Sequence, residues 1–359
     1  MSSATLSPSD ASGDQLLDQV WYTRCPVPTA SGLAFNLGWL TAALGADGLD
    51  VGILQDGPRE LARHHFDHQL VGLFREGGNV PALAARAEGA PTRLIGLTWI
   101  DEWQSILVRP DSGIDGPADL KGVRFALPAW ATTRGASFPR AMSLHGAKSA
   151  LAHGGLTLDD VTFVEIPTNA DPGASGVRWG GDRSNSLFGI DALLEGRVDA
   201  VYVKGASSAQ AALENGLRVA VDLDAYEDKR YRVNNGTPRP ITVHERLLVE
   251  RPDLVVKFLA ESLRAADWAA ANLDSVRKIL QQETWASAEG VETAYRNDFH
   301  LSLHPDLSEE RVALFARQKE FLVVHGFLAA DFDLESWIDR GPIEAARHLL
   351  ASEGAPRHD

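Results

Sequence analysis

The 359-residue sequence contains a single cysteine, Cys25. One cysteine cannot form an intramolecular disulfide, and it excludes zinc sites that use two or four cysteines. Basic residues are also scarce, because 34 Lys and Arg stand against 49 Asp and Glu and give a formal net charge of −15. Phosphate backbones and anionic membrane surfaces repel a chain this acidic, so we expect neither nucleic acid nor a membrane as a partner.

Long apolar runs are absent as well, and no stretch of about 20 residues could form a transmembrane helix. Residues 1–19 carry neither the basic region nor the apolar region of a secretory signal, so we expect a disordered leader and a cytoplasmic monomer. Hydrophobic residues make up 44% and charged residues 23% of the chain, which is typical of a folded protein. At about 150 residues per domain, the length indicates two domains.

Short runs rich in Val, Ile, Leu and Phe alternate with Ala-rich and Leu-rich stretches through the first two thirds of the chain. This pattern predicts helices over 143–153 and 190–195. It also predicts strands over 93–97, 105–108, 123–126, 161–166, 199–203 and 217–221. Such alternation favours an α/β architecture with parallel or mixed sheets.

The last hundred residues have a helical pattern instead. Pro252 stands where a first-turn proline is tolerated, and apolar residues recur behind it at helical spacing. A second helix is expected after Ser308, a suitable N-cap, and Gly326 can end it. We therefore predict a helical C-terminal third that packs on the sheets.

Residues 112–127 read SGIDGPADLKGVRFAL. This segment resembles the crossover of bilobal solute-binding proteins of the sulfonate, nitrate and thiamine-precursor group, and 195–202 (EGRVDAVY) and 249–258 (VERPDLVVKF) resemble further landmarks of that group. The resemblance implies a two-lobed, type II periplasmic-binding-protein-like fold with a ligand cleft between the lobes. We expect lobe 1 to comprise 20–115 and 223–359, and lobe 2 to comprise 116–222.

Cys25 lies in the segment Cys25-Pro26-Val27-Pro28. The two prolines stiffen this segment and disfavour a helix at Cys25, so we predict a reactive thiol near a cleft, with Arg24 as a neighbour that stabilises a thiolate. The alternative for a lone cysteine is a buried, inert thiol.

A second candidate is the histidine-rich run RHHFDH, in which His64, His65 and His68 lie close to Asp67. Histidines one helical turn apart can bind a metal, but no further carboxylate or cysteine stands at a recognisable distance, so we expect no metal. A neutral imidazole can also serve a cysteine. The alternative is a solvated polar stretch.

Third, Arg75 precedes the pair Gly77 and Gly78. A guanidinium forms a forked pair with an oxyanion, and a Gly-Gly turn can direct two N–H groups toward the same anion. The alternative is a surface arginine beside an ordinary turn. A thiol, an imidazole and an anion clamp form a coherent set for attack on an oxyanion-bearing centre.

These motifs resemble the 2′-hydroxybiphenyl-2-sulfinate desulfinases of the bacterial dibenzothiophene desulfurisation pathway. The resemblance implies that Cys25 matches their essential cysteine, His65 their histidine and Arg75 their sulfinate-binding arginine. It implies that the N–H of Gly78 also contacts the sulfinate, and that Phe138 falls near a residue of their aromatic pocket. The resemblance also implies a reaction that needs no cofactor.

The sequence departs from this family after Tyr202. The family has a Trp-rich stretch there, whereas this chain has Lys204 followed by small residues, which indicates a smaller or more polar substrate. A Gly-rich insertion over 169–184 is a candidate lid.

We therefore predict a cysteine-dependent desulfinase that hydrolyses the C–S bond of an aromatic or related organic sulfinate and releases sulfite. Cys25 would attack sulfur or deliver a proton to carbon, and His65 would orient or deprotonate the thiol. Two other classes stay open: a non-catalytic solute-binding protein for a sulfonate, pyrimidine or similar small molecule, and a different cysteine-dependent hydrolase or lyase on this fold.

Overall fold

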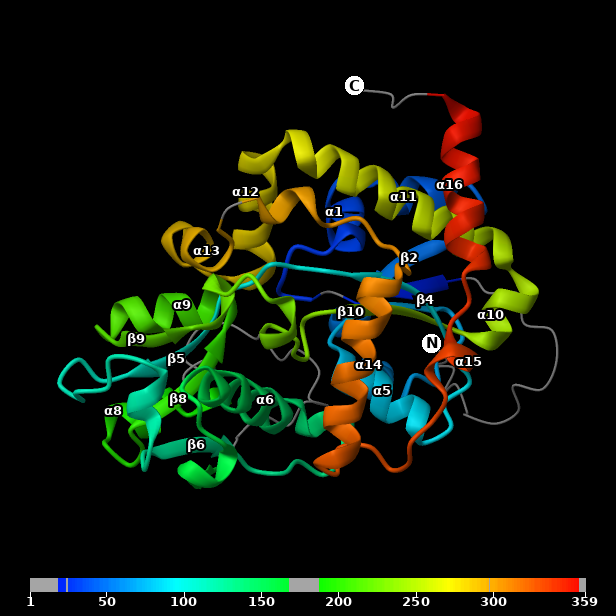
Figure 1. Cartoon of the computed structure of the whole chain (residues 1–359). Coiled ribbons are helices and arrows are strands. Elements are labelled where there is room, and N and C mark those ends of the chain that lie inside the picture. The colour runs from blue at the N-terminus through cyan, green and yellow to red at the C-terminus, as the bar shows by residue number, and fades with distance from the viewer. Residues whose placement is uncertain (1–18, 24, 168–186, 297, 355–359) are drawn as a thin grey trace, which may run out of the picture.

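The computed structural model describes residues 19–23, 25–167, 187–296 and 298–354, without the side chain of Arg59, and these residues form two five-stranded mixed sheets. The first sheet has the order β2-β1-β3-β10-β4 and the second the order β7-β6-β8-β5-β9. In Figure 1 the second sheet lies to the left of the first. The strands of the first sheet are β1 (Gln19–Tyr22), β2 (Asp50–Ile53), β3 (Leu73–Glu76), β4 (Thr92–Thr98) and β10 (Arg239–His244). Those of the second are β5 (Gln104–Val108), β6 (Arg124–Pro128), β7 (Thr162–Ile166), β8 (Ala200–Lys204) and β9 (Arg218–Asp222).

Helices cover both sheets. In the first two thirds of the chain they are α1 (Ala30–Asn36), α2 (Trp39–Gly45), α3 (Arg59–Ala62), α4 (His64–Asp67), α5 (Asn79–Ala87), α6 (Phe138–His153), α8 (Ile190–Leu194) and α9 (Gly205–Glu214). After β10 they are α10 (Glu245–Glu250), α11 (Pro252–Ala271), α12 (Leu273–Thr284), α13 (Ala288–Ala294), α14 (Glu309–Val324), α15 (Leu334–Trp337) and α16 (Gly341–Glu353). Short 3₁₀ turns are η1 (Leu54–Asp56), η2 (Pro117–Leu120), η3 (Gly135–Ser137), η4 (Leu158–Asp160), η5 (Leu223–Ala225), η6 (Lys229–Tyr231) and η7 (Phe299–Leu301). None of the described helices is both long and apolar enough to cross a membrane.

The two-lobed α/β fold and all six strands expected from the sequence are confirmed. The detailed lobe limits stay a prediction, although strand pairing puts β5 in the second sheet. The chain therefore leaves the first sheet between Thr98 and Gln104, earlier than the predicted residue 116. It returns between Asp222 and Arg239, and the predicted leader up to residue 18 lies outside the described residues.

The helical C-terminal region is also confirmed. Pro252 is the first residue of α11, whose Phe258 stacks on Phe74 of β3 with ring centroids 4.4 Å apart. The Ser308 side chain caps α14 by accepting the N–H of Arg311, and Gly326 follows the helix at φ +78°. α11 thus packs on the sheet strand that ends at the candidate site.

A chain of buried hydrogen bonds joins the two lobes. Asn79 of α5 donates to the carbonyl of Asn234 at 2.7 Å, and Asn234 donates to the hydroxyl of Tyr202 on β8 at 3.0 Å. Gln318 of α14 donates to Asn79 at 2.9 Å and contacts His145 of α6 at 2.7 Å. Because buried polar groups are costly to leave unpaired, this network fixes the return segment between the sheets.

Candidate active site

Cys25 and Arg75 lie at the same edge of the first sheet. β1 and β3 are parallel neighbours with Tyr22 opposite Phe74, so the carboxyl ends of both strands meet there. The thiol of Cys25 follows β1 and donates to the main-chain oxygen of Glu76 in β3 at 3.2 Å. The carboxyl ends of strands in α/β sheets are where ligands ordinarily bind.

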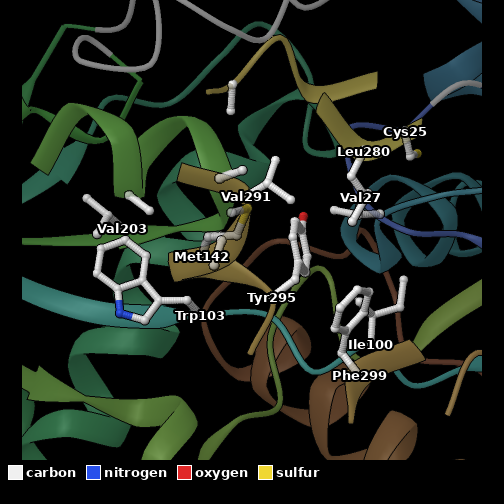
Figure 2. Close-up of a cluster of buried hydrophobic side chains, with 14 of the residues drawn as sticks. Cys25, Val27, Ile100, Trp103, Met142, Val203, Leu280, Val291, Tyr295 and Phe299 are labelled. Atoms are coloured by element: carbon white, nitrogen blue, oxygen red, sulfur yellow. The ribbon is translucent and has the colours of Figure 1, made fainter. Parts of the chain in front are cut away.

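The loop that carries Cys25 is held at several points. The N–H of Val27 donates to the Cys25 carbonyl at 2.8 Å, and the N–H of Thr29 donates to the Val27 carbonyl at 2.8 Å. The hydroxyl oxygen of Tyr295 lies 3.3 Å from the Pro26 carbonyl oxygen. In Figure 2, Cys25, Val27 and Tyr295 belong to one cluster of buried side chains. These contacts leave the thiol little freedom to move.

The prediction that Cys25 is not a core residue is wrong. The residue is 6% exposed and belongs to the main hydrophobic cluster, because the apolar loop packs inward against Leu280 and Tyr295. Burial raises the pKa of the thiol, while the charges of Arg239 and Arg75 act in the opposite direction. The thiol is therefore protonated in this arrangement, which agrees with its donation to Glu76.

Arg75 is buried and only partly satisfied. Its Nε donates to the His65 carbonyl at 3.0 Å, and its Nη2 donates to the Gly78 carbonyl at 3.0 Å. Its Nη1 is buried with no hydrogen-bond partner among the described residues. Burial, together with the charge of Arg239, lowers the pKa of Arg75 to about 10, so the group is still cationic at neutral pH. The buried Nη1 is a donor available to a ligand.

His65 contacts Arg75 rather than the thiol. Its Nε2 lies 3.4 Å from Nη2 of Arg75, so Nε2 must be the accepting nitrogen and Nδ1 must carry the proton. Burial and the charges of Arg75 and Arg239 lower the pKa of His65 well below its usual value, which keeps the ring neutral. Nδ1 is buried with no partner among the described residues. The imidazole can orient the guanidinium and donate one hydrogen bond, but it is a weak base.

Gly77 and Gly78 are required by close packing. A Cβ on Gly77 would lie 2.8 Å from Cζ of Arg75, and a Cβ on Gly78 would lie 2.5 Å from Nδ2 of Asn235. The N–H of Gly77 donates to the Pro240 carbonyl at 3.3 Å, so it is not directed at an anion as the sequence led us to expect. The glycines allow Arg75 to fold back over its own strand.

Glu76 is a site residue that the sequence analysis did not single out, although it lies inside the Arg75 motif. Its carboxylate accepts from the Ser31 hydroxyl at 2.5 Å and from the Thr98 hydroxyl at 2.8 Å. The side chain is 1% exposed. The donors from α1 and β4 therefore hold this carboxylate in place beside the strand that carries Arg75.

Lys204 and Phe138, which we predicted as substrate-binding residues, come from the second lobe. Lys204 ends β8 and forms a buried ion pair with Glu102, whose other oxygen accepts from the Tyr295 hydroxyl at 3.0 Å. Phe138 begins α6 and packs partly buried against both main hydrophobic clusters. Lys204 is thus already neutralised by a carboxylate.

Arg239 is the second residue that the sequence did not reveal. It begins β10 opposite Thr98 and is 4% exposed. Its charge influences the pKa values of Cys25, His65 and Arg75, and its Nε has no hydrogen-bond partner among the described residues. No local motif marks it, because the strand pairing brings it to the site from far along the chain.

The remaining predicted features contribute less. His64 pairs with Asp67 at 2.6 Å, and His68 is buried beside a small cavity that Arg75 and His244 also line. Within the described residues, no group of three or more His, Cys, Asp or Glu side chains could hold a metal ion. Arg24 and the insertion over 169–184 lie outside the described residues.

Known proteins resemble this chain at two levels. Residues 34–176 match the sequence family described as NMT1/THI5 like. The structure is similar to that of the aliphatic sulphonate-binding protein SsuA of Escherichia coli, with a TM-score of 0.64 at 15% identity over 90% of this chain and 91% of that one. At this identity the likeness concerns the fold, which is the type II periplasmic-binding-protein fold.

The chain is also 28% identical over 366 aligned residues to the 2′-hydroxybiphenyl-2-sulfinate desulfinase of Rhodococcus erythropolis, covering 92% of this chain and 94% of that protein. The crystal structure of the desulfurization enzyme DszB gives a TM-score of 0.74 at 26% identity, covering 92% of this chain and 99% of that one. A cysteine-to-serine DszB mutant in complex with biphenyl-2-sulfinic acid gives 0.76 at 25% identity, covering 93% and 100%. The chain therefore has an NMT1/THI5-like periplasmic-binding-protein fold and is a distant, full-length relative of the desulfinase.

Proposed function

We propose that this protein is a desulfinase that hydrolyses the C–S bond of an aromatic or related organic sulfinate and releases sulfite, with Cys25 as its catalytic residue. The observation that carries the proposal is the placement of a protonated thiol and a partly unpaired guanidinium, Cys25 and Arg75, at one sheet edge. The distant relationship to the Rhodococcus enzyme supports the same reaction class.

Arg75 binds the sulfinate. A sulfinate spreads its charge over two oxygens, and a guanidinium offers directional donors to such an anion. Nη1 supplies the donor, while the bonds to His65 and Gly78 fix the plane of the guanidinium. The Nδ1–H of His65 is a second buried donor with no partner among the described residues.

Cys25 delivers a proton to the carbon that bears the sulfinate. The thiol breaks its S–H bond as a new C–H bond forms, the C–S electron pair goes to that C–H bond, and sulfur dioxide leaves. Water adds to sulfur dioxide to give hydrogensulfite and a proton, and that proton restores the thiol. The sum is sulfinate plus water giving the desulfinated compound plus hydrogensulfite, with no change in total charge and no other reactant.

This route agrees with the ground state of the thiol better than direct attack by a thiolate does. The S–H group donates to Glu76, and burial raises the thiol pKa, so the acid form dominates. His65 has its pKa lowered and makes no hydrogen bond with Cys25 among the described residues, so it is poorly suited to deprotonate the thiol. We assign His65 to orienting Arg75.

A sulfonate-binding protein without catalysis is the alternative, and the partly unpaired Arg75 suits it equally. The two functions differ in what they require of Cys25. A panel of aryl sulfinates incubated with the protein, without added metal or cofactor, should yield sulfite from the wild type. Binding of the panel with no sulfite from any member would favour the binding protein.

A further inference from the structure

Two buried arginines of the site have no counter-ion among the described residues. Arg75 is 1% and Arg239 is 4% exposed, and each has a buried nitrogen with no hydrogen-bond partner among the described residues. Among the described residues, neither guanidinium forms an ion pair with a carboxylate. Arg232, Arg296 and Arg311 all do. Burying an uncompensated charge is strongly unfavourable, so its retention points to an anion that binds there.

The nearby carboxylates are engaged by other donors. Glu76 accepts from Ser31 and Thr98, and Glu102 is held by Lys204 and Tyr295. Lys204 therefore has its counter-ion, and Arg239 is the cation beside it whose charge is not matched.

The two guanidinium groups border different parts of the site. Arg75 turns back toward His65 and Gly78. Arg239 lies toward the second lobe, because a Cβ placed on Gly236 would be 3.6 Å from its Nη2, 2.7 Å from Nζ of Lys204 and 3.2 Å from Oε2 of Glu102. A residue larger than glycine at 236 would collide with the Lys204 ammonium, so Gly236 packs directly on the Lys204–Glu102 pair beside Arg239. One small anion has no need of two arginines that lie against different groups.

We propose that the ligand carries a second acidic group, a carboxylate or sulfonate, and that Arg239 binds it. For the identity of the first group, the sulfinate on Arg75, this inference rests on the proposed function. The Lys204–Glu102 pair, on which Gly236 packs, bounds the position of the second group on the side of the second lobe. The substrate class is therefore a sulfinate that also bears an acid.

Binding of stable sulfonates tests this independently of catalysis. Calorimetry at fixed ionic strength would compare benzenesulfonate, a monoanion, with the 2-, 3- and 4-sulfobenzoates, which are dianions. We expect at least one sulfobenzoate to bind about ten- to a hundredfold more tightly than benzenesulfonate, the gain of one charge-assisted hydrogen-bonding group. The net charge of −15 repels a dianion more than a monoanion, so the preference cannot come from the protein's overall field.

Arg239→Gln should abolish the preference, because it should lower the affinity for the dianions far more than the affinity for benzenesulfonate. Because the variant removes an unmatched buried charge, its melting temperature without ligand should not fall. Arg239→Lys keeps the charge but loses the fork, and should retain part of the preference. The control is Arg311→Gln, since Arg311 is partly buried and paired with Asp306, and this variant should keep the full preference.

Equal affinities for monoanion and dianions in the wild type, or no binding of either, would overturn the inference. So would a preference that survives in Arg239→Gln, or an equal loss for both ligand types, which would assign Arg239 to the same group as Arg75. Sulfite release is measured separately. A protein that prefers dianions through Arg239 but releases no sulfite would uphold this inference and refute the proposed reaction.

Discussion

The Sγ atom of Cys25 lies 3.2 Å from the main-chain oxygen of Glu76 and donates its hydrogen to it. A thiolate has no hydrogen to donate, so this contact selects the protonated form. It also sets the thiol beside the strand that carries Arg75, whose free donor Nη1 can hold an anion. An acid and an anion-binding group at one edge are what protonation of a sulfinate-bearing carbon requires.

The pH profile of sulfite release distinguishes a proton donor from a nucleophile. The pKa of Cys25 is raised, so the protonated thiol persists above the usual range, and kcat/KM should be level through neutral pH and fall only in the alkaline range. Since the pKa of His65 is lowered, no inflection is expected near the usual value for histidine. Rates that climb with pH through the titration of the thiol would instead identify a thiolate nucleophile.

Arg75→Lys should reduce kcat/KM by about ten- to a hundredfold, because the charge remains but the directional donors are lost. From the sequence alone we would expect little change in stability on removing a cleft-facing arginine. The structure alters that expectation, since the carbonyls of His65 and Gly78 lose their donor and the melting temperature should also fall.

Arg86→Lys is a matched control for that loss of stability. Arg86 also donates to two main-chain carbonyls, those of Ala90 and Thr92, but it lies at the far end of α5. This variant should lose stability while keeping its rate. Unchanged activity in Arg75→Lys, or an equal loss of activity in both variants, would remove Arg75 from the reaction.

His145 should make the protein sensitive to acid. It stacks on Phe321 and burial lowers its pKa to about 3, whereas an unfolded histidine titrates near 6.5. Between these two pKa values, His145 is protonated in the unfolded chain and neutral in the folded chain. The full stability is therefore present above pH 6.5, and about 1.4 kcal/mol is lost per pH unit below it for this one group.

Urea unfolding at several pH values between 4 and 8 measures this effect. His145→Asn should show a slope below pH 6.5 that is smaller than the wild-type slope by about one proton. Equal slopes in the two proteins would mean that His145 titrates normally in the folded state.

Access to Cys25 should require the lobes to separate. The residue is 6% exposed and its cluster includes Met142 and Val203 of the second lobe. Iodoacetamide should therefore label the folded protein far more slowly than the urea-unfolded protein, and a bound sulfonate should slow labelling further. Labelling of the folded protein at the unfolded rate would show that the thiol is open to solvent.

Local sequence pattern was sufficient to predict much of the fold. The six predicted strands contain runs of apolar residues between turn formers, and Pro252 and Ser308 marked their helices through ordinary capping rules. The strands β1, β2 and β3 were not predicted because each has only four residues. β10 was not predicted either, because it contains Pro240 and a proline makes a strand less expected.

The site was predictable only where its residues lie in short motifs. Cys25, His65 and Arg75 were found because each stands in a recognisable segment. Glu76 and Arg239 were missed for different reasons: Glu76 was passed over between Arg75 and the Gly-Gly turn, and Arg239 reaches the site only through the pairing of β10 with β3 and β4. The burial of Cys25 depends on packing by α12 and α13, which no local pattern reports.

Sulfite release by the wild type and by Cys25→Ser tests the central claim most directly. Both proteins would be incubated with biphenyl-2-sulfinate and with carboxylated benzenesulfinates. Sulfite and the desulfinated product would each be quantified in the same samples. The wild type should release the two in equal amounts from at least one substrate. Cys25→Ser should fold and bind a sulfonate normally but be at least about a thousandfold slower, because a hydroxyl is a far weaker acid than a thiol. No sulfite from any of these sulfinates, or undiminished release by Cys25→Ser, would contradict the account.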